Sequence, residues 1–247
     1  MKETRLLMGM PVTVEIIDRK AKQSDIGRIF DYFTYVDETF STYKESSEIS
    51  AINAGRHPRK QWSADMRYVL EQCERCRQET GGYFNISRDG NFLDPSGYVK
   101  GWAIQNAAAR LAEAGFRNYY VEAGGDLQVR GQNAAGQPWR IGIRNPFNRN
   151  EIVKTVNLDN HGLATSGTSI RGQHIYDPYR VDQPILDTVS LTVIGPNIVD
   201  ADRYATAAFA MGRNGIGFIA KLEGFEGYMI DKDGIATLTP GFKEYCA

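Results

Sequence analysis

The sequence has few of the residues that mark several common classes of protein. Its 247 residues include three cysteines and three histidines, and 29 basic residues are balanced by 30 acidic ones, for a formal net charge of −1. A chain with this balance has no overall basic field to attract nucleic acid or an anionic membrane. We therefore expect no nucleic-acid partner, and any small anionic ligand would need a local site.

Long apolar segments are also missing. No apolar run approaches the roughly 20 residues needed to cross a bilayer. The short apolar stretch at residues 6–10 is too small to be the core of a signal peptide. We therefore expect no membrane span and a cytoplasmic location, with an exported mature form whose leader has been removed as the alternative.

Two of the cysteines, Cys73 and Cys76, have the spacing found in redox pairs and in half of a zinc site. No second Cys or His pair at ligand spacing accompanies them. They also continue the helical spacing of Met66, Val69 and Leu70. Because a free thiol commonly packs as a small hydrophobic group, we interpret both as core residues of a helix.

Helices are predicted mainly in the first half of the chain and strands mainly in the second half. Helical spacing marks residues 25–40, 48–53, 64–80 and 99–114, and later residues 202–211 and 216–222. Strand patterns mark residues 12–16, 119–123, 127–130, 139–143, 152–158, 189–194, 227–230 and 235–238. This grouping predicts an α+β fold. We expect one domain over residues 1–247, in which two closely packed lobes are possible.

A lysine stands in the first turn of one predicted helix. Lys100 follows a Pro-Ser-Gly turn, at a position where exposed amides suit an anion and where a lysine opposes the helix dipole. A negative group nearby would explain its presence. The alternative is an ordinary capped turn with a solvated lysine.

Two adjacent glycines, Gly124 and Gly125, separate two predicted strands and have Glu122 and Asp126 on either side. Such a pair forms a tight turn or bulge, and it also lets a ligand approach the backbone closely. The spacing is not that of a dinucleotide-binding fingerprint, and no helix follows.

A third stretch places Asp202 and Thr206 one helical turn apart, on the same face. A carboxylate and a hydroxyl offer the hard oxygen ligands that Mg²⁺ prefers. The alternative is that Asp200 or Asp202 only caps the helix. His174, which follows the polar and turn-prone residues 162–167, is by itself better explained as a structural histidine.

Taken in order, these stretches resemble the motifs of ApbE-like FAD:protein FMN transferases. The matching segments are Met8-Gly9-Met10, Phe40–Tyr43 with Ser50–Asn53, Asp94–Gly101, Glu122–Asp126, Ala164–Gly167 with His174–Pro178, and Asp202–Thr206. Each match is weak alone, but six in family order cover nearly the whole chain.

The resemblance implies a T-fold-like α+β architecture, with a helical side packed on a mostly antiparallel, β-rich side and FAD in a cleft between them. It also implies the reaction. Enzymes of this family cleave the pyrophosphate of FAD and attach FMN to a Thr or Ser hydroxyl of an acceptor protein, releasing AMP. The alternatives are an FAD pyrophosphatase that yields free FMN and AMP, and a flavin-binding protein without catalysis.

The resemblance further implies the residues of the site. The flavin-nucleotide site would include Met8, Tyr43, Tyr83, Phe84, Asn85, Asp94, Lys100, Gly124, Gly125, Thr165 and Ile185. One or two Mg²⁺ ions would be held by Gly97, Asp202, Thr206 and the Ala205 carbonyl. His174 would accept the proton of the acceptor hydroxyl, and Asp177 would orient it or hold substrate. Asn85 departs from the family, which often has Asp there.

Overall fold

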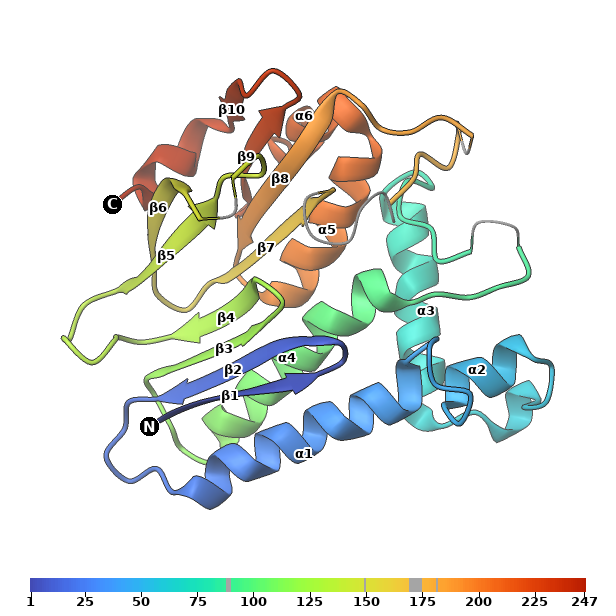
Figure 1. Ribbon diagram of the computed structural model, residues 1–247, viewed down its shortest axis with the longest axis horizontal. Coiled ribbons are helices and arrows are strands. Elements are labelled where there is room, and N and C mark those ends of the chain that lie inside the picture. The colour runs from blue at the N-terminus through green and yellow to red at the C-terminus, as the bar shows by residue number, and fades with distance from the viewer. Residues whose placement is uncertain (88–89, 149, 169–174, 181) are drawn as a thin grey trace.

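The computed structural model describes residues 1–87, 90–148, 150–168, 175–180 and 182–247. The strands are β1 (Lys2–Leu7), β2 (Met10–Ile16), β3 (Tyr119–Ala123), β4 (Asp126–Arg130), β5 (Trp139–Arg144), β6 (Ile152–Leu158), β7 (Gly162–Gly167), β8 (Thr188–Gly195), β9 (Glu226–Asp231) and β10 (Ala236–Leu238). The α-helices are α1 (Gln23–Phe40), α2 (Glu48–Asn53), α3 (Ala64–Glu79), α4 (Ser96–Glu113), α5 (Ile198–Ala210) and α6 (Gly215–Ile219). Figure 1 shows their arrangement.

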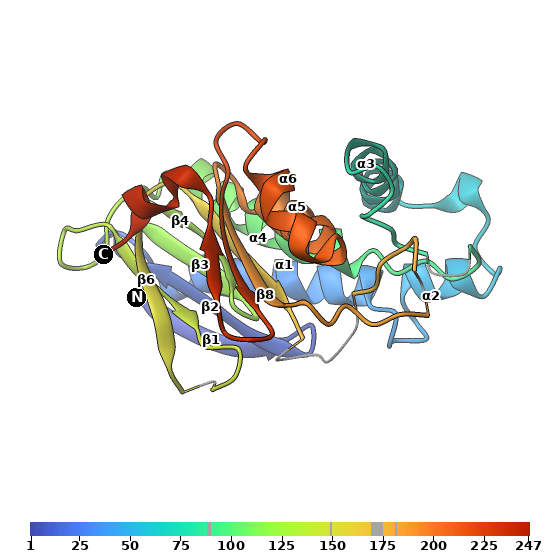
Figure 2. The same ribbon diagram turned by 90° about the horizontal axis from the view of Figure 1, so that it is seen from above.

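Eight of the strands form one antiparallel sheet in the order β1-β2-β3-β4-β7-β8-β9-β10, and β5 pairs with β6 in a separate two-stranded sheet. Seen from above, α5 and α6 cover one face of the large sheet and β6 lies on the opposite side (Figure 2). This confirms the predicted α+β class, with helices on one side of a mostly antiparallel sheet.

A separate hydrophobic core packs against each face of the large sheet. Side chains alternate along a strand, so Val121 of β3 packs with the helices while Leu127 and Val129 of β4 pack with Trp139 of β5. The second core also takes in Phe242 near the C-terminus, which is fully buried. The β5–β6 sheet is therefore fastened to the large sheet by packing.

The sequence located most elements but missed two strands. Strand β1 was missed because half of its residues are charged and most are exposed, so it shows no alternating apolar pattern. Residues 162–167 were described as turn-prone because they are small and polar, yet they form β7 and pair with β8 along their whole length. Small residues are needed there, since a Cβ on Gly162 would lie 2.3 Å from the Ile198 nitrogen.

Two interpretations of single residues are settled by burial and capping. Cys73 and Cys76 are buried in α3, and burial raises the pKa of both thiols, which confirms the core interpretation. Helix α5 begins four residues before Asp202, and its N-cap is Asn197, whose side chain accepts from the Asp200 nitrogen at 2.9 Å. The helix-cap alternative is therefore wrong for Asp202.

No helix in the described ranges is long and apolar enough to cross a membrane.

Helices α4 and α5 approach each other closely at Gly101. A Cβ on this residue would lie 2.9 Å from the Asp202 Cβ and 3.0 Å from the Ile198 carbonyl oxygen. Both distances are shorter than a normal carbon contact, so a side chain at this position would push the two helices apart.

We therefore expect Gly101→Ala to lower the free energy of unfolding by about 1–3 kcal/mol, the usual cost of overpacking. The matched control is Gly27→Ala in α1, where a Cβ meets nothing within 4 Å. The free energy of unfolding of the control should rise by roughly 0.5–1 kcal/mol, because alanine has a better helix propensity than glycine. Urea denaturation of both variants measures the difference, and equal effects of the two substitutions would contradict it.

Candidate active site

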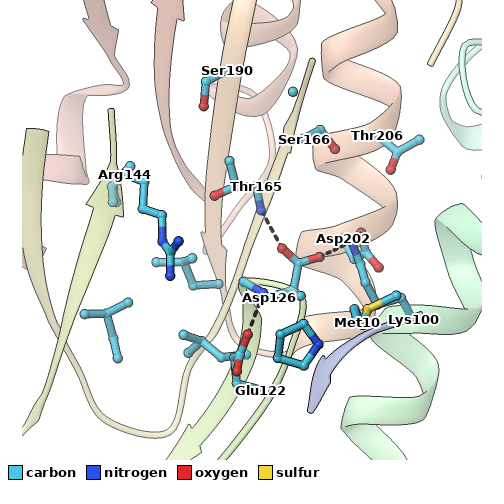
Figure 3. A pocket seen from close by; sticks show the side chains of 18 of the residues that line it. Met10, Lys100, Glu122, Asp126, Arg144, Thr165, Ser166, Ser190, Asp202 and Thr206 are labelled. Atoms are coloured by element: carbon cyan, nitrogen blue, oxygen red, sulfur yellow. Dashed lines mark hydrogen bonds and ion pairs between the residues drawn. The ribbon is translucent and has the colours of Figure 1, made fainter. Parts of the chain in front are cut away.

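A cavity of about 1800 Å³ extends from the N-terminal end of α4 to the β5 strand. Its walls come from residues 83–86 and 94–100, the β3–β4 turn, β5, β7 and two side chains of α5. Figure 3 shows part of this lining, with charged and hydroxyl side chains turned toward one another. The helical side and the β-rich side of the molecule therefore both contribute to it.

Three ionisable side chains meet on the cavity wall and are called here the charged centre: Lys100 of α4, Asp126 of β4 and Asp202 of α5 (Figure 3). The Lys100 ammonium pairs with the Asp126 carboxylate and lies 3.5 Å from Oδ1 of Asp202. Both carboxylate side chains are only 2 % exposed. The negative group expected near Lys100 is thus present. The helix itself starts earlier than predicted, at Ser96, so Lys100 follows its first turn.

Backbone amides hold both carboxylates in place. The Gly101 nitrogen donates to Oδ2 of Asp202 at 2.9 Å, and the Thr165 nitrogen donates to Oδ1 of Asp126 at 2.9 Å. The second bond fills a gap in the sheet, because β4 and β7 pair at only two positions, Leu127 with Leu163 and Gln128 with Gly162. Beyond those pairs the Asp126 carboxylate takes the place of a backbone acceptor.

The electrostatics of the charged centre are dominated by burial. Removal from water raises the pKa of the Asp202 carboxyl, Lys100 opposes this shift, and the neighbouring Asp126 adds to it. Two carboxylates and one ammonium carry a formal charge of −1 when ionised. A buried site with excess negative charge favours a further cation.

The residues beside the charged centre suit magnesium. Asp202, Thr206 and Gly97 all line the cavity. Gly97 lies against Thr206, since a Cβ on Gly97 would be 3.6 Å from the Thr206 hydroxyl oxygen. Mg²⁺ is usually held by one or two carboxylates together with substrate phosphates and water, and this set of oxygen donors fits that pattern. Among the described residues no group of three His, Cys, Asp or Glu side chains could hold a metal by itself.

The two glycines form the tight turn between β3 and β4, and both also line the cavity. Gly124 has φ +61° and Gly125 has φ +100°, the left-handed region that favours glycine. A Cβ on Gly124 would lie 2.8 Å from the sulfur of Met10. The Gly125 nitrogen donates to Oε1 of Glu122 at 2.6 Å, and burial raises the pKa of that carboxyl.

The other residues predicted for the site divide into two groups. Those that line the cavity are Tyr83, Phe84, Asn85, Asp94 and Thr165. Those that do not are Met8, Tyr43, Asp177, Ile185 and Ala205. Tyr43 is 97 % exposed and Ala205 is completely buried. The carboxylate of Asp177 accepts from the Tyr179 nitrogen at 2.9 Å. His174 lies outside the described residues.

Sequence reasoning gave no role to Asp126, which pairs with Lys100, or to residues 139–146, which form a wall of the cavity. Asp126 was visible only as the acidic residue after two glycines. Its partners are far away in the chain, so no spacing rule reveals them.

Comparison with known proteins identifies the family of this chain. A family model described as the ApbE family matches residues 8–90 and 86–229. The chain belongs to the ApbE family. Among solved structures, the flavin transferase ApbE from Vibrio cholerae has a TM-score of 0.86 at 23 % identity, and the match covers 99 % of this chain and 98 % of that one. An ApbE protein from Thermotoga maritima also has a TM-score of 0.86, at 21 % identity with the same coverage. These neighbours confirm the ApbE fold.

Curated relatives in the ApbE family carry one name. The FAD:protein FMN transferase of Salmonella typhimurium is 34 % identical over 167 residues, which are 62 % of this chain and 47 % of that protein. The protein of the same name from Escherichia coli strain K12 is 32 % identical over 167 residues, with the same coverage. The chain therefore spans about half the length of the curated relatives that it matches.

We expect Lys100→Met to lower the free energy of unfolding at neutral pH by about 3–5 kcal/mol, because it leaves two buried carboxylates without their cation. The control Lys221→Met removes an exposed lysine and should change stability by no more than about 0.5 kcal/mol. Chemical denaturation measures both effects. Equal stability of the two variants would mean that the ion pairs of Lys100 contribute nothing.

Glu122→Gln tests the partly buried carboxyl near the end of β3. Burial raises the folded-state pKa of Glu122 above its unfolded value, so wild type loses stability as pH rises through the folded pKa. Glutamine cannot ionise and still offers an oxygen to the Gly125 nitrogen. The variant should therefore gain stability relative to wild type as the pH rises above about 4, the ordinary pKa of a glutamate, as measured by urea unfolding at several pH values. A parallel shift in the exposed control Glu113→Gln would remove Glu122 as the cause.

Proposed function

We propose that this protein transfers the FMN part of FAD to a Thr or Ser hydroxyl of an acceptor protein and releases AMP. The observation that supports this most is the charged centre with its neighbouring oxygen donors, on the wall of a cavity large enough for a dinucleotide. Family membership and the names of the curated relatives, FAD:protein FMN transferase, point to the same activity.

Binding of FAD would use both sides of the cavity. Tyr83 offers an aromatic face for a ring system, and Lys100 offers its ammonium to the diphosphate. Phe84 is only 1 % exposed and contributes to the wall as a core residue. Asp202, Thr206 and the Gly97 carbonyl would hold Mg²⁺ against the phosphates. When bound, the ion would neutralise negative charge that develops on the phosphate oxygens.

The transfer would be an in-line displacement at phosphorus. The acceptor hydroxyl oxygen attacks the phosphorus of the FMN half and forms a new phosphoester bond. The bond from that phosphorus to the bridging oxygen breaks, and its electron pair leaves with AMP. The hydroxyl proton passes to His174 as general base, with Asp177 as the residue that orients it or holds substrate.

The reaction itself is tested by incubating the protein with FAD, Mg²⁺ and candidate acceptor proteins, and by following AMP and flavin-labelled acceptor by mass spectrometry. Labelled acceptor and AMP in equal amounts are expected. AMP formed at the same rate with and without acceptor, and no labelling, would instead identify an FAD pyrophosphatase. Binding of FAD without AMP release would identify a flavin-binding protein.

For the metal site, we expect Asp202→Asn to lower the rate of FMN transfer by roughly 10–100-fold, since it removes a charged ligand. EDTA should abolish transfer by wild type, and added Mg²⁺ should restore it. The matched control is Asp200→Asn on the same helix, whose carboxylate pairs with Arg203 outside the cavity. If both variants transfer FMN at the wild-type rate, or if EDTA has no effect, the metal assignment is wrong.

For the general base, we expect His174→Ala to bind FAD with wild-type affinity but to lose transfer by ~10²–10⁴-fold, the usual contribution of such a base. FAD affinity by fluorescence titration and yield of labelled acceptor are measured on the same variant. Normal yield would exclude His174 as the base, and lost affinity would make it a substrate contact.

A further inference from the structure

The strand β5 lines the cavity with consecutive residues instead of alternate ones. All eight consecutive residues from Trp139 to Pro146 line it, whereas no residue of β6, all of which are described, does so. Because side chains alternate along a strand, a strand that presented one face would contribute every second residue. The strand therefore borders the cavity with its backbone edge.

Within the described part of the chain, this edge has no partner strand. β5 pairs with β6 alone. The outer edge of β6 is closed by the C-terminus, since Val156 bridges Cys246 and the Ala247 nitrogen donates to the Thr155 carbonyl at 3.0 Å. In an antiparallel ladder, alternate residues turn their N–H and C=O groups away from the paired strand. Alternate residues of β5 thus offer donors and acceptors to the cavity.

The space along this edge is continuous with the charged centre. The cavity, at about 1800 Å³, is larger than the roughly 300–1,000 Å³ typical of small-molecule sites. Thr13 and Glu15 of β2 and Tyr120 of β3 line the same cavity, and the Tyr120 ring lies 5.6 Å from the Trp139 ring of β5 between centroids. A strand of six residues provides about 20 Å of hydrogen-bonding edge.

At the end of β5 a register shift between Ile143 and Arg144 interrupts the ladder. Such an irregularity bends a strand and redirects a side chain. Arg144 points into the cavity (Figure 3) and lies near enough to Glu122 to oppose in part the rise that burial causes in the pKa of that carboxyl. The unpaired edge of β5 therefore ends next to the charged side chains of Arg144 and Glu122.

We propose that an extended segment of the acceptor protein adds to β5 as a third strand of the β5–β6 sheet and so brings its Thr or Ser to the charged centre. This inference rests on the proposed function. A polypeptide matches the edge because only a backbone offers donors and acceptors at the same alternating spacing. The enzyme would recognise the main chain of the acceptor segment. The occupants that compete with it for the space beside β5 are a nucleotide and a second copy of this chain.

Backbone methylation of an acceptor peptide tests the pairing. The probe is the Thr- or Ser-containing peptide that wild type labels best from FAD, with each amide N-methylated in turn. A paired strand uses every second amide, so labelling should fall about tenfold or more at alternate positions, as for the loss of one or two hydrogen bonds. A uniform response along the peptide would overturn the proposal. If wild type labels neither a peptide nor a protein, the proposed function fails and this inference fails with it.

A pair of enzyme variants gives an independent test. Ile141→Lys places a charge in the space beside β5, and Ile152→Lys places one on β6 outside the cavity, where the native side chain is 50 % exposed. We expect Ile141→Lys to raise KM for the acceptor about tenfold and leave the FAD-dependent thermal shift unchanged, whereas Ile152→Lys behaves as wild type. Weaker FAD binding by Ile141→Lys would assign the space to the nucleotide. A wild-type dimer that dissociates in this variant would assign it to a second copy. Either result overturns the proposal.

Discussion

The ion pair between Lys100 and Asp126 joins the parts of this molecule that must meet for a site to exist. Lys100 lies near the start of α4, Asp126 begins β4, and the neighbouring Asp202 lies in α5. Charges buried to this extent are tolerated only when each has partners. The positions of two helices and a strand are therefore linked through three side chains.

Several features of the backbone follow from that constraint. Because Gly101 has no side chain, α5 can approach α4 closely enough for the Gly101 amide to donate to Asp202. The Gly124–Gly125 turn lets β4 start at Asp126, and the sheet pairs weakly between β4 and β7 so that Asp126 can receive the Thr165 amide. An interrupted sheet costs backbone hydrogen bonds, and the carboxylate restores one of them. The same interruption places the charged centre on the cavity wall.

The cavity also explains why the β5–β6 sheet is kept apart from the large sheet. Packing through Trp139 and Phe242 holds it against the large sheet, and the Trp139 indole nitrogen also donates to the Arg130 carbonyl of β4. The ladder of β5 is formed with β6, and β6 in turn bridges to the C-terminal residues. An exposed strand edge invites unwanted pairing between molecules. Facing this edge into a cavity limits what can reach it.

The sequence by itself determined most helices, most strands and the buried cysteines, because hydrophobic periodicity records which face of an element is covered. It also identified Asp202, Thr206 and Lys100 as residues in need of partners, and motif order identified the family. It did not predict β7, whose small polar residues are needed because α5 lies against them. Nor did it reveal that Lys100 pairs with Asp126, or that β5 has a free edge. Those features depend on contacts between residues far apart in the chain, and only the folded backbone decides which distant groups share a buried space.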